Sequence, residues 1–92
     1  MSDIRPISES EFLNLATGRE SIADISWDEK EWYANGSKTI LGVVVQDRID
    51  RDWGYVVLKP DDKGVKRAID QESSLPDMET ARTGLLDAMG KV

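Results

Sequence analysis

The stretch TILGVVV, residues 39–45, and the stretch WGYVVL, residues 53–58, decide the fold of this chain. Both are rich in β-branched residues, and their apolar side chains fall on both faces of a strand. A sheet with one wet face shows alternation of apolar and polar residues instead, so strands of this kind are buried on two sides. The sequence therefore predicts a sheet with one face covered by a helix and the other covered by a second helix or a partner molecule.

Turn signals around these strands predict an antiparallel meander. Asn35 and Gly36 tolerate the positive φ angles of a type I′ turn, so we expect a two-residue hairpin loop in which Trp32 faces Thr39. Trp32 then shares a strand face with residues 41, 43 and 45. The polar segment 47–52 and the sequence PDDKG at 60–64 predict two further turns. A fourth, less apolar strand follows at residues 65–70.

A short helix is expected before the sheet, over residues 9–17. Ser8 and Glu11 match a capping box, in which the Ser8 hydroxyl accepts from the Glu11 amide and the Glu11 carboxylate returns to the Ser8 amide. Ile7 and Phe12 occupy the positions of a hydrophobic staple, and Gly18 is a plausible stop.

A second helix is expected after the sheet. Asp77 is its predicted N-cap, because Pro76 stops any helix that begins earlier. One apolar face then recurs at steps of three and four residues: Met78, Ala81, Leu85, Ala88, Met89 and Val92. Gly42 marks either a bulge or a close approach by a covering helix, and Gly84 either permits close packing against the sheet or is merely tolerated in the helix. We predict a single α+β domain of residues 1–92, with a four-stranded antiparallel meander and the second helix on one face.

Cysteine and histidine are both absent from the 92 residues. Their absence excludes a disulfide framework, thiolate zinc sites, nucleophiles paired with imidazole and a histidine pH switch. The amino terminus has no basic region followed by an apolar stretch, and no run approaches the roughly 18 apolar residues of a membrane-spanning helix. We therefore expect a cytoplasmic protein without a membrane partner and without a cofactor.

Asp47, Asp50 and Asp52, followed by Gly54, suggest a calcium loop. The spacing does not fit, because an EF-hand needs acids at its first, third and fifth positions, a glycine at the sixth and a glutamate at the twelfth. Two arginines between the acids also neutralise them, so we expect a polar hairpin turn and no metal site. The chain lacks a glycine-rich phosphate loop, a nucleophile elbow and paired acids in apolar surroundings. We therefore expect no catalytic residue and no enzymatic activity.

Five of the six aromatic residues lie in or near the predicted sheet. Such residues are usually core, and on an uncovered face they anchor a partner. Our first hypothesis is a non-catalytic protein-binding module that binds a protein or a second copy of itself. Trp32 or the pair Trp53 and Tyr55 would be its anchors, on the sheet face away from the second helix.

The net charge of −6 opposes non-specific attraction to DNA, RNA or anionic lipid. Eight of the eighteen acids lie in residues 1–36, where only three bases occur. The acidity of residues 1–36 has two interpretations. The segment is a solvated surface, or it belongs to an inhibitor that occupies a host protein's nucleic-acid site. The alternative hypothesis is a nucleic-acid-binding domain that uses Arg48, Arg51, Lys66 and Arg67 together with the aromatic residues on the open sheet face.

Four segments in order resemble a group of small uncharacterised bacterial proteins that are often encoded on mobile elements: LGVVVQDRID at 41–50, DWGYVVL at 52–58, RAID at 67–70 and the helix introduced by SLP at 74–76. The resemblance covers about residues 31–92. It implies this layout and no activity. The architecture also looks like the DNA-binding domains of plant ethylene-response factors and the amino-terminal domains of tyrosine integrases, which use arginine and aromatic side chains on the sheet face left open by the helix.

Overall fold

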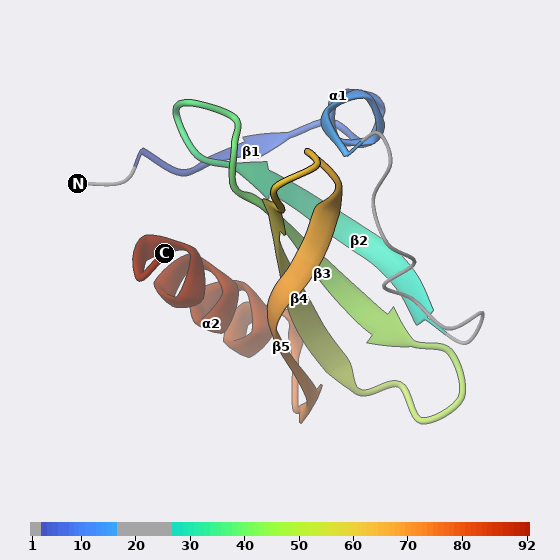
Figure 1. Cartoon of the computed structure of the whole chain (residues 1–92). Helices are drawn as coiled ribbons and strands as arrows, with labels where there is room; N and C mark the ends of the chain where they lie inside the picture. The colour runs from blue at the N-terminus through green and yellow to red at the C-terminus, as the bar shows by residue number, and fades with distance from the viewer. Residues whose placement is uncertain (1–2, 17–26) are drawn as a thin grey trace.

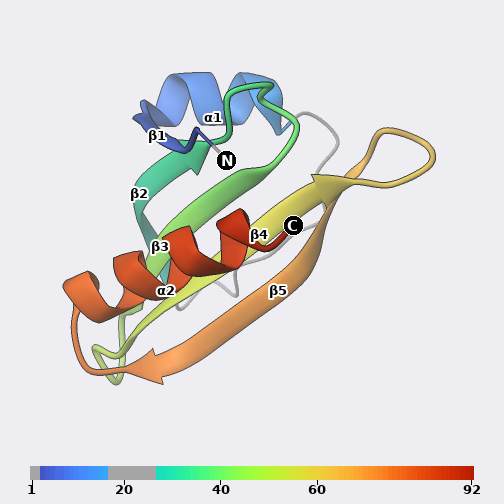
Figure 2. The ribbon, with the colours of Figure 1, turned by 90° about the vertical axis from the view of Figure 1, so that its left-hand side faces the viewer.

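A computed structural model of the chain describes residues 3–16 and 27–92 (Figure 1). The described residues form one antiparallel sheet with the strand order β1-β2-β3-β4-β5. Helix α2 covers one face and α1 lies against the other. Figure 2 shows α2 lying across the strands, with α1 at the β1 end of the sheet. The elements are β1 (Arg5–Ile7), α1 (Glu9–Leu15), β2 (Trp27–Ala34), β3 (Leu41–Asp47), β4 (Trp53–Pro60), β5 (Lys66–Leu75) and α2 (Met78–Gly90).

The predicted α+β fold with an antiparallel meander is confirmed, but the number of strands is wrong. The additional strand is β1, which pairs with β2 through Arg5 opposite Ala34 and Ile7 opposite Trp32. Three residues are too few to show a strand pattern, and Pro6 argues against a strand unless it lies at an edge. The structure places β1 at the edge of the sheet, where a proline is tolerated. The fourth predicted strand is β5, which extends to Leu75 and so is longer than expected.

The hairpin between β2 and β3 differs from the predicted type I′ turn. Trp32 pairs with Val43, four residues beyond Thr39, and the loop spans residues 35–40. The Asn35 side-chain oxygen accepts from the amides of Thr39 at 2.9 Å and Ile40 at 3.0 Å. The left-handed residue in this loop is Lys38, with φ 60°. Because the register differs by an even number of residues, Trp32 still shares a face with residues 41, 43 and 45, as predicted.

The middle strands are buried on both sides, as the sequence predicts. All five residues from 41 to 45 in β3 and all five from 54 to 58 in β4 are buried. The α2 face contributes Tyr33, Ile40, Val44, Tyr55 and Val57, packed with Ala81, Leu85, Ala88 and Met89. The opposite face contributes Ala34, Leu41, Val43, Val45, Val56 and Leu58, packed with Phe12 and Ala16. The sheet is therefore the middle layer of the fold.

Two glycines allow α2 to approach the sheet closely. A Cβ at Gly42 in β3 would lie 2.6 Å from Met89 Sδ, and a Cβ at Gly84 in α2 would lie 2.8 Å from Tyr55 Cε2. Both distances are too short for real side chains, so neither position has room for a larger residue. The predicted close packing is confirmed. The register shifts lie in β2, between Glu29 and Glu31, and in the β4–β5 pair, and none lies at Gly42.

Polar caps begin both helices at the predicted residues. Ser8 Oγ accepts from the Glu11 amide at 3.1 Å, while the Glu11 carboxylate lies 3.0 Å from Lys38 Nζ. Helix α1 ends at Leu15, and the expected stop at Gly18 lies outside the described residues. Asp77 Oδ1 accepts from the Thr80 amide at 2.7 Å.

Val92 lies beyond the end of α2 and is exposed, so it does not belong to the buried face of the helix. No helix in the described ranges is long and apolar enough to span a bilayer.

Candidate protein-binding groove

A groove lies on the α1 face of the sheet, at the end where β3 passes into β4. Its volume is about 380 Å³. Its lining residues come from β2, β3, β4 and β5: Trp27, Val45, Tyr55, Val56, Gln71, Glu72 and Ser73. Trp27, Val45 and Val56 belong to the hydrophobic cluster of this face, while Gln71 and Ser73 are exposed on the edge strand. The groove therefore combines apolar side chains with a polar rim, which is typical of ligand-binding sites in proteins.

A bulge in β5 forms one wall of the groove. The strand carries Ser73 and Ser74 opposite the single residue Gly54, and Ser74 has φ 62°. A Cβ at Gly54 would overlap the carbonyl oxygen of Glu72 and would lie 3.2 Å from the Ser73 Cα atom. Glycine at position 54 therefore allows β5 to pass close to β4 and to place Glu72 and Ser73 beside the groove.

A second bulge, between Glu29 and Glu31 in β2, brings two tryptophans to the same face. Trp27 and Trp32 are five residues apart, so a regular strand would place them on opposite faces. With the bulge, both indoles pack partly against the α1-face cluster. Trp32 Nε1 donates to Glu29 Oε1 at 3.3 Å. Trp32 thus lies on the predicted face, and Trp27, which sequence reasoning did not choose as an anchor, lines the groove.

The prediction that Trp53 and Tyr55 lie on the face away from α2 is wrong. Both belong to the α2 face, where Tyr55 is 6% exposed and Trp53 is partly buried. The Tyr55 hydroxyl donates to Glu72 Oε2 at 3.2 Å. Burial raises the pKa of Tyr55, and the carboxylates of Asp70 and Glu72 raise it further. Tyr55 is therefore a core residue beneath α2.

The four cationic residues of the nucleic-acid hypothesis do not come together. Arg48 and Arg51 lie in the β3–β4 loop, and Lys66 and Arg67 lie at the opposite end of β4, after the β4–β5 turn. Because β4 has eight residues, these ends are about 25 Å apart. The Arg48 guanidinium also forms an ion pair with Asp28, with Nε 2.6 Å from Oδ1.

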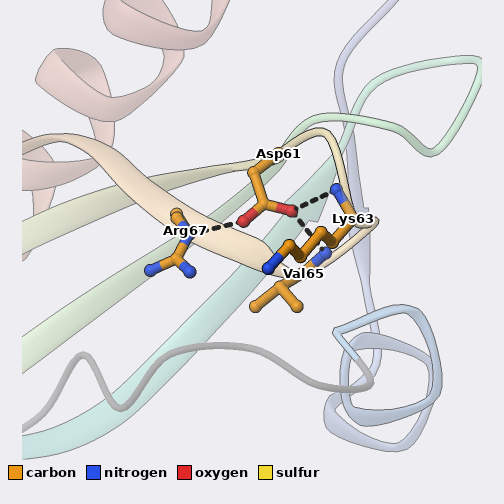
Figure 3. A network of polar contacts seen from close by, with 4 residues as sticks. All are labelled: Asp61, Lys63, Val65 and Arg67. Atoms are coloured by element: carbon orange, nitrogen blue, oxygen red, sulfur yellow. Dashed lines mark hydrogen bonds and ion pairs between the residues drawn. The ribbon is translucent and has the colours of Figure 1, made fainter.

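Asp61 organises the β4–β5 turn and also binds Arg67 (Figure 3). One carboxylate oxygen accepts from the amides of Lys63 at 2.8 Å and Val65 at 3.0 Å, and the other lies 2.6 Å from Arg67 Nε. The Arg67 side chain, followed by these amides, lowers the pKa of Asp61. Gly64 has φ 81°, as predicted for this turn.

The Asp47 carboxylate stabilises the β3–β4 loop through hydrogen bonds to its backbone. Asp47 Oδ1 accepts from the amides of Ile49 at 2.7 Å and Asp50 at 3.1 Å. Among the described residues, no group of three or more acidic side chains is placed to hold a metal ion. This geometry matches the polar hairpin turn expected from the sequence.

Comparisons of the chain with protein-family models, with curated proteins and with solved structures found no match.

Proposed function

We propose that the protein is a small non-catalytic protein-binding module that receives side chains of its partner in the groove beside Trp27. The observation that carries this proposal is the position of Trp27, which packs partly on the apolar cluster and also lines an open groove. Tryptophan is enriched at protein interfaces because its large ring contributes apolar contact at a low entropy cost. The groove volume of about 380 Å³ accommodates one or two side chains of a partner.

The net charge of −6 supports a partner with a basic docking surface, since complementary charge steers association. This also fits an acidic inhibitor that competes for a host protein's nucleic-acid site. The alternative, a nucleic-acid-binding domain, has less support. Arg48 and Arg67 are each paired with an aspartate, and they lie at opposite ends of β4.

The proposal is tested with peptides that are selected from a random display library for binding to the full chain. Gln71 is an exposed residue at the rim of the groove, so Gln71→Trp fills the groove without changing a core residue. We expect this variant to bind the selected peptides at least about tenfold more weakly. Lys59→Trp is the matched control, because Lys59 is exposed on the same sheet but does not line the groove.

Equal affinity of both variants for every selected peptide would contradict a docking site in this groove. Titration with generic DNA and RNA at low salt tests the alternative. Phosphate contacts would give binding that weakens by about 0.9 log units per log unit of salt for each duplex phosphate neutralised. Such a salt dependence would favour the nucleic-acid hypothesis if, in addition, Gln71→Trp weakened the binding of no selected peptide.

A further inference from the structure

The loop between β2 and β3 contains an asparagine followed by a glycine, a pair whose backbone reacts readily with its own side chain. Glycine lacks a Cβ atom, so the Gly36 amide nitrogen approaches the carboxamide of Asn35 with little hindrance. The other asparagine of the chain, Asn14, precedes a leucine, whose side chain hinders the same approach. Asn35 is half-buried and Gly36 is exposed, so solvent reaches the peptide bond that joins them.

The reaction is an intramolecular deamidation. The Gly36 amide nitrogen attacks the Asn35 Cγ atom and forms a bond with it, and the bond between Cγ and Nδ2 breaks. The side-chain nitrogen leaves as ammonia and takes up the proton that the Gly36 nitrogen loses. Water then opens the cyclic imide at one of its two carbonyl groups. The product at position 35 is aspartate, or isoaspartate, in which the main chain runs through the former side chain.

In the closed loop, every polar atom of Asn35 forms a hydrogen bond. Its amide donates to the Ile40 carbonyl at 3.1 Å, and its carbonyl accepts from the Lys38 amide at 3.0 Å. Its side-chain oxygen accepts from the amides of Thr39 at 2.9 Å and Ile40 at 3.0 Å. Its side-chain nitrogen donates to Thr39 Oγ1 at 3.2 Å. The backbone and the side chain of Asn35 are therefore held in one conformation.

The cyclic imide requires a different conformation of Asn35. Its planar ring eclipses the Cα–Cβ bond, whereas side chains normally occupy staggered rotamers. Rotation about this bond moves the side-chain oxygen away from the Thr39 and Ile40 amides, which then lose their acceptor. A reactive arrangement of the two atoms that must join is thus incompatible with the closed loop.

We propose that Asn35 is a deamidation site that the closed β2–β3 loop protects, so that local opening of this loop controls the reaction. Local opening of this kind is a general property of folded proteins, and surface loops open at low cost. Aspartate at position 35 retains an acceptor for the two amides. Isoaspartate lengthens the main chain of the loop, so the loop no longer closes on the same hydrogen bonds. Opening that ends in isoaspartate therefore alters the hairpin permanently, at the end of β2 where β1 pairs with it.

Incubation of the full chain in native buffer and in guanidinium chloride, at the same pH and temperature, tests the proposal. Peptide mapping by mass spectrometry locates the product, and a methyltransferase specific for isoaspartate quantifies it. We expect Asn35 to react at least about tenfold more slowly in the folded chain than in the unfolded chain. Asn14 is an internal control, because it should react more slowly than Asn35 in guanidinium chloride.

Amide hydrogen exchange measures the opening of the loop independently. The amides of Thr39 and Ile40 lose their bond to the Asn35 side chain only when the loop opens. Their protection factor should therefore match the ratio of the unfolded and folded deamidation rates within about an order of magnitude.

Three variants separate the loop from the rest of the fold. Thr39→Val removes the hydroxyl that binds the Asn35 side-chain nitrogen, so deamidation should be faster in the folded variant and unchanged in guanidinium chloride. Thr83→Val, the same change at an exposed site on α2, is the matched control and should react at the wild-type rate. Gly36→Ala hinders the attacking nitrogen and should slow the reaction in both solvents. The loop has room for this methyl group, because the nearest atom to a Cβ is 3.5 Å away.

Equal rates in the folded and unfolded chain would overturn the proposal, because the loop would then give no protection. If the Thr39 and Ile40 amides exchanged much faster than the ratio of rates requires, the protection would come from elsewhere in the fold, and the role of this loop would be wrong. Reaction at Asn14 in place of Asn35 in the unfolded chain, or an unfolded-state rate that Gly36→Ala leaves unchanged, would overturn the assignment of the site.

Discussion

Arg82 on α2 and Glu31 on β2 form a bidentate ion pair that ties the helix to the sheet. Arg82 Nε lies 2.8 Å from Glu31 Oε1, and Nη2 lies 2.7 Å from Oε2. The Tyr33 hydroxyl donates to the same Oε1 at 3.0 Å. Both charged side chains are partly exposed, so solvent weakens their attraction. Even so, this pair joins residues 51 positions apart in the chain and fixes where α2 crosses the strands.

Glu31→Gln should make stability less dependent on pH. The Arg82 side chain lowers the pKa of Glu31 below its usual 4.5. A lowered folded-state pKa contributes stability that is complete above the unfolded pKa and is lost as the pH falls through the folded one. In urea unfolding, the wild type should therefore exceed the variant at pH 7, and the difference should shrink below about pH 4. Asp62→Asn, an exposed change in the β4–β5 turn, should behave like the wild type.

Gly84→Ala should destabilise the protein, although alanine ordinarily stabilises a helix interior by about 1 kcal/mol relative to glycine. The new methyl group would lie 2.8 Å from the Tyr55 ring, and α2 has to move away from the sheet. We expect a loss of about 1 to 3 kcal/mol in the free energy of unfolding, measured by urea titration. Gly90→Ala is the control, because a methyl group at position 90 would have no other atom within 4 Å. An equal response of the two variants would disprove the close contact.

Asn35→Ala should loosen the β2–β3 hairpin. The side-chain oxygen accepts two backbone amides that close the loop, so its removal should lower the free energy of unfolding by about 1 to 2 kcal/mol. Gly36→Ala should have little effect, since Gly36 does not have a positive φ and the nearest atom to a Cβ is 3.5 Å away. A type I′ turn predicts the opposite order, with Gly36→Ala the more damaging. Thermal unfolding of both variants distinguishes the two.

Gly54→Ala should damage the groove and the fold together. The methyl group would overlap the Glu72 carbonyl, so β5 must shift away from β4. We expect a destabilisation of about 1 to 3 kcal/mol and weaker binding of groove-selected peptides. Gly90→Ala is the matched control: it also adds one methyl group, but in open space away from the groove, so it should retain both properties. Amide hydrogen exchange of residues 66–75 measures the shift, and unchanged protection in Gly54→Ala would contradict it.

Some features of the candidate site could not be predicted, because no short stretch of the sequence indicates them. The sequence placed Trp53 and Tyr55 together on one face of β4, and they do lie together. Which face α2 covers was not readable from β4, because both sides of that strand are apolar. The position of Trp27 was equally hidden, because it depends on one extra residue in β2, and a bulge has no strong signature in residue type.

Local chemistry by itself determined the two-sided burial of β3 and β4, both helix caps and the turn built on Asp61 and Gly64. These features depend on hydrogen bonds and side-chain periods that span only a few residues. Tertiary structure alone decided the edge strand β1, the register of β2 against β3, and the two bulges that shape the groove. Each of these is set by packing between distant segments. The register of β2 against β3 differs from the expected one by an even number of residues, so every side chain stays on its face and the pattern shows no trace of the shift. Each bulge adds one residue, and no residue type marks where it does so.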